Sequence, residues 1–561
     1  MASRSGRLSR IVLALAVLST PLPAIAGSIE SSDLPPIEGD QGDVAPSPDS
    51  TPSSPAQSAT AGPAEWLGLP LTEIEHLSKE ASHPLGSPML ASLWHQLLKG
   101  GPVGQPDALA YRARELLDGG WSKDAAALLA KAPQGDLKLS LLLARAALAD
   151  GDGTSACPIL KSVAAAEAIK LDQPYRTDFV STAAFCAAAT RDETQTALAA
   201  DVMRESGLDR PITLAVLDGL GSGSAPELGD ARVHDLAEAR LLGLMRPIRM
   251  QDLSEKPSPA LISLIAESPG DDALSRAEAT EQTVLAHLAP ASVLSEAYTA
   301  IEIAPDVRQN PLAQDAEGTL KRAILYQAAT KESAMLRKSR YIRALLDETT
   351  REGFGYPAAA LLADAVVALP QVGEIGWFGE TAVEVLVAAG RRAEAAAWIT
   401  RDAELDTSGN RTGLGHWLVL ADMGSGAREG RGEAMSELER AAKAGLFTPD
   451  VLQRTVTVLD ALEYNVPIPV WEMAGSGTQA NDGDLPETGL LSKLQAAVQA
   501  GNRPQTVLLS VLALAKGGPS GAHQLVVGDV IRALRKVGME REARTLAFEA
   551  LYPLWPRRAG G

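Results

Sequence analysis

Aromatic residues make up only 4% of this 561-residue sequence, although 45% of its residues are hydrophobic. Alanine, leucine and valine must therefore supply most of the apolar surface, a composition that favours closely packed helices over sheets. This scarcity argues against an all-β fold. The chain is also too long for one ordinary globular core, so we expect several domains or an elongated array.

Basic residues are too few to balance the acidic ones, with 51 Lys and Arg against 70 Asp and Glu. A negatively charged protein repels nucleic acids and anionic lipid headgroups. We therefore expect neither as a partner.

Long apolar runs are missing, since a transmembrane helix needs about 20 apolar residues. The apolar run at residues 11–18 is less than half that length. It follows Arg4, Arg7 and Arg10 and precedes the small residues up to Ala26. This pattern predicts a secretory signal peptide, residues 1–26, whose removal leaves 48 basic and 70 acidic residues, a formal charge of about −22. The alternative is an uncleaved amphipathic leader.

Cysteine is nearly absent, with only Cys157 and Cys186. An exported chain meets an oxidising compartment, so we expect a disulfide between them, which could stabilise the fold by roughly 3 to 4 kcal/mol. The alternative is a pair of small buried thiols. The Ala-rich, Cys-poor composition favours the periplasm of a two-membrane bacterium, with full secretion left open.

Residues 27–63 are predicted to be a disordered acidic linker. The segment 28–63 holds seven prolines, six acids and no Lys or Arg, so it cannot bury enough apolar surface to offset chain entropy. The linker would be either a spacer for the folded body or an unconstrained leader.

After about residue 65, apolar residues recur at helical spacing, and no convincing strand pattern interrupts them. One helix junction recurs: residues 120–125, 390–395 and 538–543 all read Gly-x-x-x-acid-Ala. The glycine can adopt the left-handed conformation that ends a helix, and the acid favours the first turn of the next one. The pattern therefore predicts repeated helical hairpins. Weaker copies occur at Gly430 to Ala434, Gly501, Asp150-Gly151-Asp152 and Arg191-Asp192.

At these junctions the chain resembles the tetratricopeptide-like helical repeats, whose turn commonly reads Gly, a polar or aromatic residue, then acid-Ala. The resemblance is clearest over residues 107–133, 380–400 and 526–552. It implies an all-α fold, an α-solenoid of helical hairpins that presents a surface for protein binding. A single large irregular helical domain with similar turns is the alternative.

Two glycine-rich breaks suggest how the array is divided. We expect N-terminal repeats over 64–218, central repeats over 219–474, a loop at 475–489 and a C-terminal helical cap over 490–561. The stretch 219–223 looks like a phosphate loop, but no strand precedes it and no Lys-Ser or Lys-Thr follows, so we interpret it as a flexible connection. Residues 485–489 resemble a sortase signal, yet more than 70 residues of helical pattern follow, which indicates a loop and helix start.

The sequence gives no convincing catalytic, cofactor or metal site. Glu75, His76, Glu80 and His83 form the densest group of metal-ligand types. An acidic amphipathic helix explains this group without a metal. Neither a Gly-x-Ser-x-Gly elbow nor a His-Glu-x-x-His motif is present.

Four aromatic residues gather in and around one well-formed repeat: Trp377, Phe378, Trp398 and Trp417. Exposed aromatics would anchor a partner, whereas core packing is their commoner use.

We expect a non-enzymatic envelope scaffold that binds other proteins, without a cofactor. The alternatives are a protein associated with the peptidoglycan wall, or related to wall-lytic enzymes, and a lumenal protein that binds a small ligand or polysaccharide.

Overall fold

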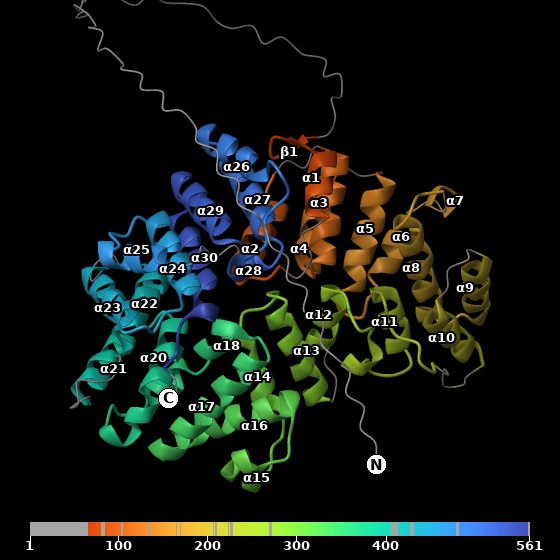
Figure 1. The fold of residues 1–561 in the computed structure, drawn as a ribbon. Helices are drawn as coiled ribbons and strands as arrows, with labels where there is room; N and C mark the ends of the chain where they lie inside the picture. Colours follow the sequence, from red (N-terminus) through yellow and green to blue (C-terminus); the bar gives the residue numbers. More distant parts are fainter. Residues whose placement is uncertain are drawn as a thin grey trace, which may run out of the picture. The chain divides into compact units, whose positions relative to one another are not determined.

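Apolar positions at helical spacing form α-helices throughout the described part of the chain (Figure 1). The computed structural model describes residues 65–79, 85–101, 105–132, 135–163, 165–168, 170–205, 207, 210–222, 224, 228–268, 272–405, 413–426, 431–477 and 482–558. The predicted signal peptide and the whole of the predicted linker lie outside these ranges. The all-α prediction is confirmed, and packed helix pairs run through the array.

The elements follow one another in chain order and are divided into three groups for reference only. The first group contains β1 (Glu65–Trp66), β2 (Leu69–Pro70), α1 (Leu71–Ser78), α2 (Pro88–Lys99), α3 (Pro106–Asp118), α4 (Ser122–Leu129), α5 (Leu137–Leu148), α6 (Ala156–Lys161), α7 (Ala165–Ala168), α8 (Tyr175–Ala189), α9 (Glu193–Glu205), α10 (Pro211–Ser222) and α11 (Leu236–Gly243). The second contains the 3-10 helix η1 (Met250–Asp252), α12 (Pro259–Glu267), α13 (Ala273–Leu285), α14 (Val293–Ala300), α15 (Pro305–Gln309), η2 (Pro311–Ala313), α16 (Gly318–Lys331), α17 (Met335–Arg351), α18 (Gly355–Ala360) and α19 (Ala363–Val367). The third contains η3 (Gly373–Phe378), α20 (Gly379–Ala388), α21 (Arg392–Leu405), η4 (Leu414–Trp417), α22 (Leu418–Ser425), α23 (Arg431–Lys443), α24 (Pro449–Ala461), α25 (Ile468–Gly475), α26 (Leu490–Gln499), α27 (Arg503–Leu514), α28 (Gly518–Gly521), α29 (Gln524–Lys536), α30 (Glu540–Leu551) and η5 (Tyr552–Leu554).

The core lies between the apolar stripes of neighbouring helices, and α29 with α30 shows the pattern. These two helices pack on each other, and α29 also packs on α24. The side chains of both stripes are fully buried: Val527, Val530, Ile531, Leu534, Ala543, Leu546, Ala547 and Ala550. Alanine at three of these eight positions, all on α30, brings the helix axes close together, as the composition suggests.

The recurring junction has the predicted backbone conformation. Gly120, Gly390 and Gly538 have φ of 85°, 68° and 81°. The N–H of the residue after each glycine donates to the carbonyl five residues earlier: Trp121 to Leu116 at 2.8 Å, Arg391 to Leu386 at 2.8 Å and Met539 to Leu534 at 2.9 Å. This bond satisfies a carbonyl that the helix end leaves without an intrahelical partner.

Two further junctions use residues other than glycine, and the sequence pattern misses them. His287 and Glu463 both have φ of 58°. The residues after them, Leu288 and Tyr464, each donate a 2.9 Å hydrogen bond to the carbonyl five residues earlier. The helix-end geometry therefore recurs more often than its glycine signature.

Two sequence expectations need correction. The break expected from residue 219 begins later, because α10 continues through Ser222 and contains most of the supposed flexible connection. A short β-hairpin, β1 with β2, precedes α1, although no strand was expected. Strands of two residues are too short to show an alternating pattern.

Helices near the start of the array contact helices near its end. Helix α2 packs against α27 and α30, and Figure 1 shows these segments side by side. Lys493 of α26 forms an ion pair with Glu73 of α1 across the same contact. Among the helices within the described ranges, none combines the length and apolar character that crossing a bilayer requires.

Candidate functional site

The aromatic group expected as a partner surface is mostly core, which corrects that hypothesis. Phe378 and Trp417 are fully buried and Trp398 is 3% exposed, whereas Trp377 is 41% exposed. The Phe378 and Trp398 rings pack edge to face, with centroids 6.0 Å apart. Burial of these rings between neighbouring helices removes them from any partner, so three of the four residues cannot form a surface.

Trp417 holds the C-terminal segment in place. Its ring lies 6.5 Å from that of Trp555, which also packs at 5.3 Å from Phe447. His416 Nε2 contacts the carbonyl of Pro556 at 3.1 Å. Burial lowers the pKa of His416 to about 4, and the two backbone carbonyls beside it only partly oppose this effect. The neutral ring therefore donates one hydrogen bond at neutral pH.

Ion pairs fix the same segment to α20 and α21. Arg558 contacts Asp402 at 3.1 Å, and its backbone N–H donates to Glu380 at 3.0 Å. Arg557 forms an ion pair with Glu384. The region that the aromatic pattern singled out therefore anchors the end of the chain.

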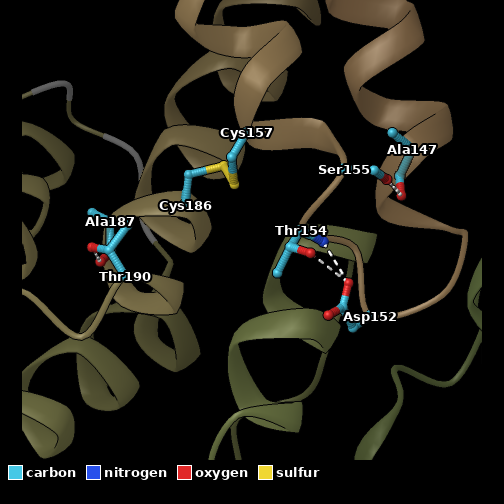
Figure 2. Close-up of a disulfide and its surroundings, with 8 residues drawn as sticks. All are labelled: Ala147, Asp152, Thr154, Ser155, Cys157, Cys186, Ala187 and Thr190. Atoms are coloured by element: carbon cyan, nitrogen blue, oxygen red, sulfur yellow. Dashed lines mark hydrogen bonds between the residues drawn. A yellow bond between two sulfur atoms is a disulfide. The ribbon is translucent and has the colours of Figure 1, made fainter.

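The two cysteines form a disulfide, as expected from the sequence. Cys157 of α6 and Cys186 of α8 have Cα atoms 5.5 Å apart, and their sulfur atoms are bonded (Figure 2). In the turn before α6, Asp152 accepts hydrogen bonds from the backbone N–H of Thr154 at 3.0 Å and from its hydroxyl at 2.6 Å. The disulfide fastens a short helix to a long one and is a structural feature.

The described residues contain no cluster of three or more His, Cys, Asp or Glu arranged to hold a metal ion. His76 lies 3.8 Å from Glu487, whereas Glu80 and His83 lie outside the described residues. Glu487 belongs to the sortase-like stretch, which lies between α25 and α26, and Gly489 directly precedes α26. That stretch is therefore a loop followed by a helix start.

Two cavities meet at Trp121, a residue that the sequence showed only as part of a helix junction. The α5 lobe, of about 690 Å³, lies between α4, α5, α12 and α13. The α18 lobe, of about 790 Å³, lies between α2, the turn at 287–292 and α18. The residues common to both lobes are Trp121, Asp124, Leu288 and Ala289. We call the two lobes together the Trp121 cleft.

The helix junction places Trp121 at this position. Gly120 has φ of 85°, and a Cβ atom there would lie 2.9 Å from side-chain atoms of both Leu288 and Pro259. Glycine thus allows the α3–α4 turn to contact the start of α12 and the turn after α13. Trp121 follows directly and is half-buried between the lobes.

A polar network fixes the Trp121 ring. His95 of α2 stacks on it, with ring centroids 4.6 Å apart and an interplanar angle of 23°. His95 Nε2 lies 2.7 Å from Asp124, and Lys99 lies 2.8 Å from the other oxygen of the same carboxylate. Burial alone raises the pKa of Asp124, but the hydrogen bonds from Lys99 and His95 outweigh it and hold the pKa below its usual value. The network therefore contains a carboxylate that stays charged at neutral pH.

The walls of the α5 lobe are mainly apolar. Seven alanines line it, together with Leu143, Leu264, Leu288 and Val293. Small side chains on facing helices leave the space that larger ones would fill. Such a lobe suits apolar side chains of a ligand.

The mouth of the α5 lobe carries an excess of negative charge. Its lining includes the carboxylates of Asp150 and Glu267 against the ammonium of Lys123, besides Asp124, which Lys99 already neutralises. Lys123 bridges from α4 to Glu267, at the end of α12, at 2.8 Å, and both side chains are largely exposed. One ammonium group is thus shared by neighbouring carboxylates.

The α18 lobe has a different polar character. His287 lines it, and burial lowers the pKa of this residue to about 4, so the ring is neutral at physiological pH. Tyr356 also lines the lobe, with its hydroxyl bonded to Glu549 at 2.8 Å. The wall is therefore tied to the last helix of the array.

Sequence reasoning could have found Trp121 by comparing the three junctions. The residue after the junction glycine is Arg391 or Met539 in the other two copies. In the structure, Arg391 is exposed and Met539 is 5% exposed. Trp121 is the large aromatic residue of the three, and it is half-buried. An aromatic at a turn is a weak signal on its own, because only the packing of α12 and α13 creates a cavity beside it.

No protein-family model matches this sequence, and neither a curated protein nor a solved structure is significantly similar to it. The helical-repeat architecture therefore rests on the packed hairpins described above.

Proposed function

We propose that this protein is a non-enzymatic binding protein of the cell envelope that holds a segment of a partner protein in the Trp121 cleft. One observation carries the proposal: a half-buried tryptophan, fixed by stacking on His95, stands where two large cavities join. Rigid aromatic side chains in concave surroundings are common anchors at protein interfaces. A ring that is already fixed loses little conformational entropy on binding.

The dimensions and lining of the cleft support a ligand-binding role. Binding cavities commonly measure about 300–1,000 Å³ and combine apolar walls with a few polar groups. Each lobe falls within that range. The cleft lies on packed helices, which hold a binding surface more rigidly than loops do.

The envelope location rests on two features of the chain. The N-terminal pattern predicts export, and the Cys157–Cys186 disulfide is a bond that persists in oxidising compartments. We propose the periplasm, with envelope proteins as partners.

A second candidate function is association with the cell wall. An aromatic ring and several carboxylates in one cavity could also pack on and hydrogen-bond to a sugar ring, and the Trp121 cleft has both. The alanine-rich walls favour the first proposal, because a polysaccharide presents hydroxyl groups that these walls leave unbonded.

The test is affinity capture of the mature protein from crosslinked envelope extract, with three baits: wild type, Trp121→Ala and Trp377→Ala. Trp377 is the matched control, as an exposed tryptophan outside the cleft. We expect one set of proteins to be enriched with wild type and Trp377→Ala and lost with Trp121→Ala. Equal enrichment with all three baits would refute the cleft as the site. Retention of the wild type on purified cell wall, lost in Trp121→Ala, would favour the second candidate.

A further inference from the structure

The chemistry of the α5 lobe indicates what kind of segment binds there. The lobe combines apolar walls, an acidic mouth and a helix start whose polar groups lack partners. The walls indicate apolar side chains in the ligand, the mouth indicates a positive charge, and the helix start indicates a hydrogen-bond acceptor. The inference rests on the proposed function, since it names the ligand class of the same cleft.

Ser122 is the clearest unsatisfied group. It is 9% exposed, lines the α5 lobe, and its Oγ has no hydrogen-bond partner among the described residues. Buried polar side chains are nearly always hydrogen-bonded, so such a group calls for an explanation. This Oγ is enclosed in the free protein, so a ligand in the lobe would supply the missing partner once the Ser122 side chain rotates toward it.

Helix α4 provides further donors at the same place. It begins at Ser122 with Trp121 as the preceding cap residue, and no side chain caps it. The first N–H groups of a helix have no intrahelical acceptor. A backbone carbonyl of a bound peptide could accept from them, beside the Trp121 ring.

The acidic mouth selects the charge of the ligand. Lys123 contacts Glu267 at 2.8 Å and also lies in the field of Asp150. Arg240 also lies in the field of Asp150 and of Asp152. Three carboxylates, those of Asp150, Asp152 and Glu267, therefore face two cations, which leaves one net negative charge. A basic side chain of the ligand would complete this group, either beside Lys123 or in its place.

Other ligand classes fit these features less well. An anionic lipid headgroup would be repelled by the mouth, and an uncharged acyl chain would make no use of it. A polysaccharide would bury hydroxyl groups against alanine side chains. An extended peptide satisfies all three features, and the two lobes on either side of Trp121 provide room along its length.

We propose that the Trp121 cleft binds an extended peptide segment in which apolar side chains, seated in the alanine-walled α5 lobe, neighbour a lysine or arginine that pairs with Asp150 and Glu267. The peptide backbone hydrogen-bonds to Ser122 and to the start of α4. Lys123 occupies part of the cation position in the free protein and competes with the ligand for Glu267.

The first experiment selects peptides from a random 12-residue phage library on the mature protein, with counter-selection on Trp121→Ala. We expect the enriched sequences to contain more Lys and Arg than Asp and Glu, next to Leu, Ile or Val. Enrichment of acidic or uncharged sequences, or no enrichment, would overturn the peptide class. Partner capture that still depends on Trp121 would then leave the proposed function standing, so the two failures are distinguishable.

The second experiment measures the affinity of the most enriched peptide by fluorescence anisotropy. Glu267→Gln and Ser122→Ala should each weaken binding by roughly three- to tenfold, because each removes one ligand contact. Lys123→Met should tighten binding by a similar factor, since it removes the competitor for Glu267. If the Lys123–Glu267 pair had only a structural role, Lys123→Met and Glu267→Gln would both weaken binding. That result would overturn the proposal.

Matched controls separate binding from folding. Ser510 of α27 is fully buried and, like Ser122, has an Oγ without a partner among the described residues, but it lies outside the cleft. Ser510→Ala should leave peptide affinity unchanged, as should Asp201→Asn, which removes an exposed carboxylate on α9. Equal loss of affinity in Ser122→Ala and Ser510→Ala would contradict a direct contact at Ser122.

Discussion

The hydroxyl of Tyr356 donates a 2.8 Å hydrogen bond to Glu549, a residue 193 positions later in the chain. Glu549 lies on α30 and also accepts hydrogen bonds from the Ser87 hydroxyl and, at 3.2 Å, from the Met89 backbone N–H. Since Ser87 and Met89 form the start of α2, one carboxylate joins the beginning, middle and end of the array. Tyr356 and α2 also line the α18 lobe, so the same contact shapes the cleft.

Replacing Glu549 should destabilise the protein according to how many donors lose their acceptor. Glu549→Ala leaves one buried and two partly buried donors without their acceptor, and we expect a loss of about 3 kcal/mol in the free energy of unfolding. Glu549→Gln keeps the volume and one acceptor, and Tyr356→Phe removes one bond, so each should cost about 1 kcal/mol. Urea denaturation monitored by circular dichroism measures all three. Equal stability of Glu549→Ala and wild type would contradict this role.

Stability should depend on pH through buried carboxyl groups. Burial raises the pKa of Glu549 and Glu238 to about 7 and that of Asp178 to about 6, although hydrogen bonds or nearby arginines partly oppose it. The native state therefore binds protons that the unfolded chain releases, and stability falls as pH rises through these values. We expect the free energy of unfolding to be about 1–2 kcal/mol higher at pH 6 than at pH 8.

The matched control for this pH effect is Glu549→Gln, which cannot titrate. Its stability should rise less than that of the wild type between pH 8 and pH 6. His287 and His416, whose pKa values are lowered to about 4, act in the opposite direction below about pH 6.5, because the unfolded chain then gains protons that the native state excludes. Identical pH profiles for the two proteins would exclude Glu549 as a source of the effect.

The buried and exposed tryptophans should respond differently to truncation. Trp417→Ala opens a cavity beside Trp555 and His416, and we expect a loss of about 3–5 kcal/mol. Trp377 is 41% exposed, so Trp377→Ala should cost much less, about 1 kcal/mol. Thermal unfolding distinguishes the two. A larger loss for Trp377→Ala would reverse our assignment of core and surface.

Two junction glycines provide a matched pair for backbone strain and packing. Gly120 and Gly538 have φ of 85° and 81°, but a Cβ at Gly538 would meet nothing within 4 Å, whereas one at Gly120 would lie 2.9 Å from Leu288 and Pro259. Gly538→Ala should therefore cost about 1 kcal/mol through strain alone. Gly120→Ala should cost about 2 kcal/mol or more and should also weaken ligand binding, because it displaces the walls of the Trp121 cleft. Equal losses of stability would contradict the close contact at Gly120.

Reduction of the disulfide should lower stability by roughly 3 to 4 kcal/mol, since Cys157 and Cys186 are 29 positions apart. Urea denaturation with and without dithiothreitol measures this. The double variant Cys157→Ala/Cys186→Ala is the control, and its stability should not respond to the reductant. A response of the double variant would show that dithiothreitol acts elsewhere.

Several local features could be predicted from the sequence because their causes are local. The glycine at residues 120, 390 and 538 specifies a left-handed helix end whatever surrounds it, and the apolar stripes of α29 and α30 specify their buried faces. The disulfide followed from having only two cysteines. The helix ends at His287 and Glu463 could not be predicted in this way, because neither histidine nor glutamate specifies a left-handed helix end as glycine does.

The sequence by itself determined the helical class, the hairpin junctions, the cysteine pair and the excess of negative charge, since these depend on composition and on residues close together in the chain. Only the tertiary structure decided which tryptophans are core and which line a cavity. Trp417 is buried because the end of the chain returns to cover it, and Trp121 borders a cavity because α12 and α13, about 140 residues later, pack beside its turn. The neighbours that decide each case are distant in sequence, and residue spacing within one hairpin carries no information about them.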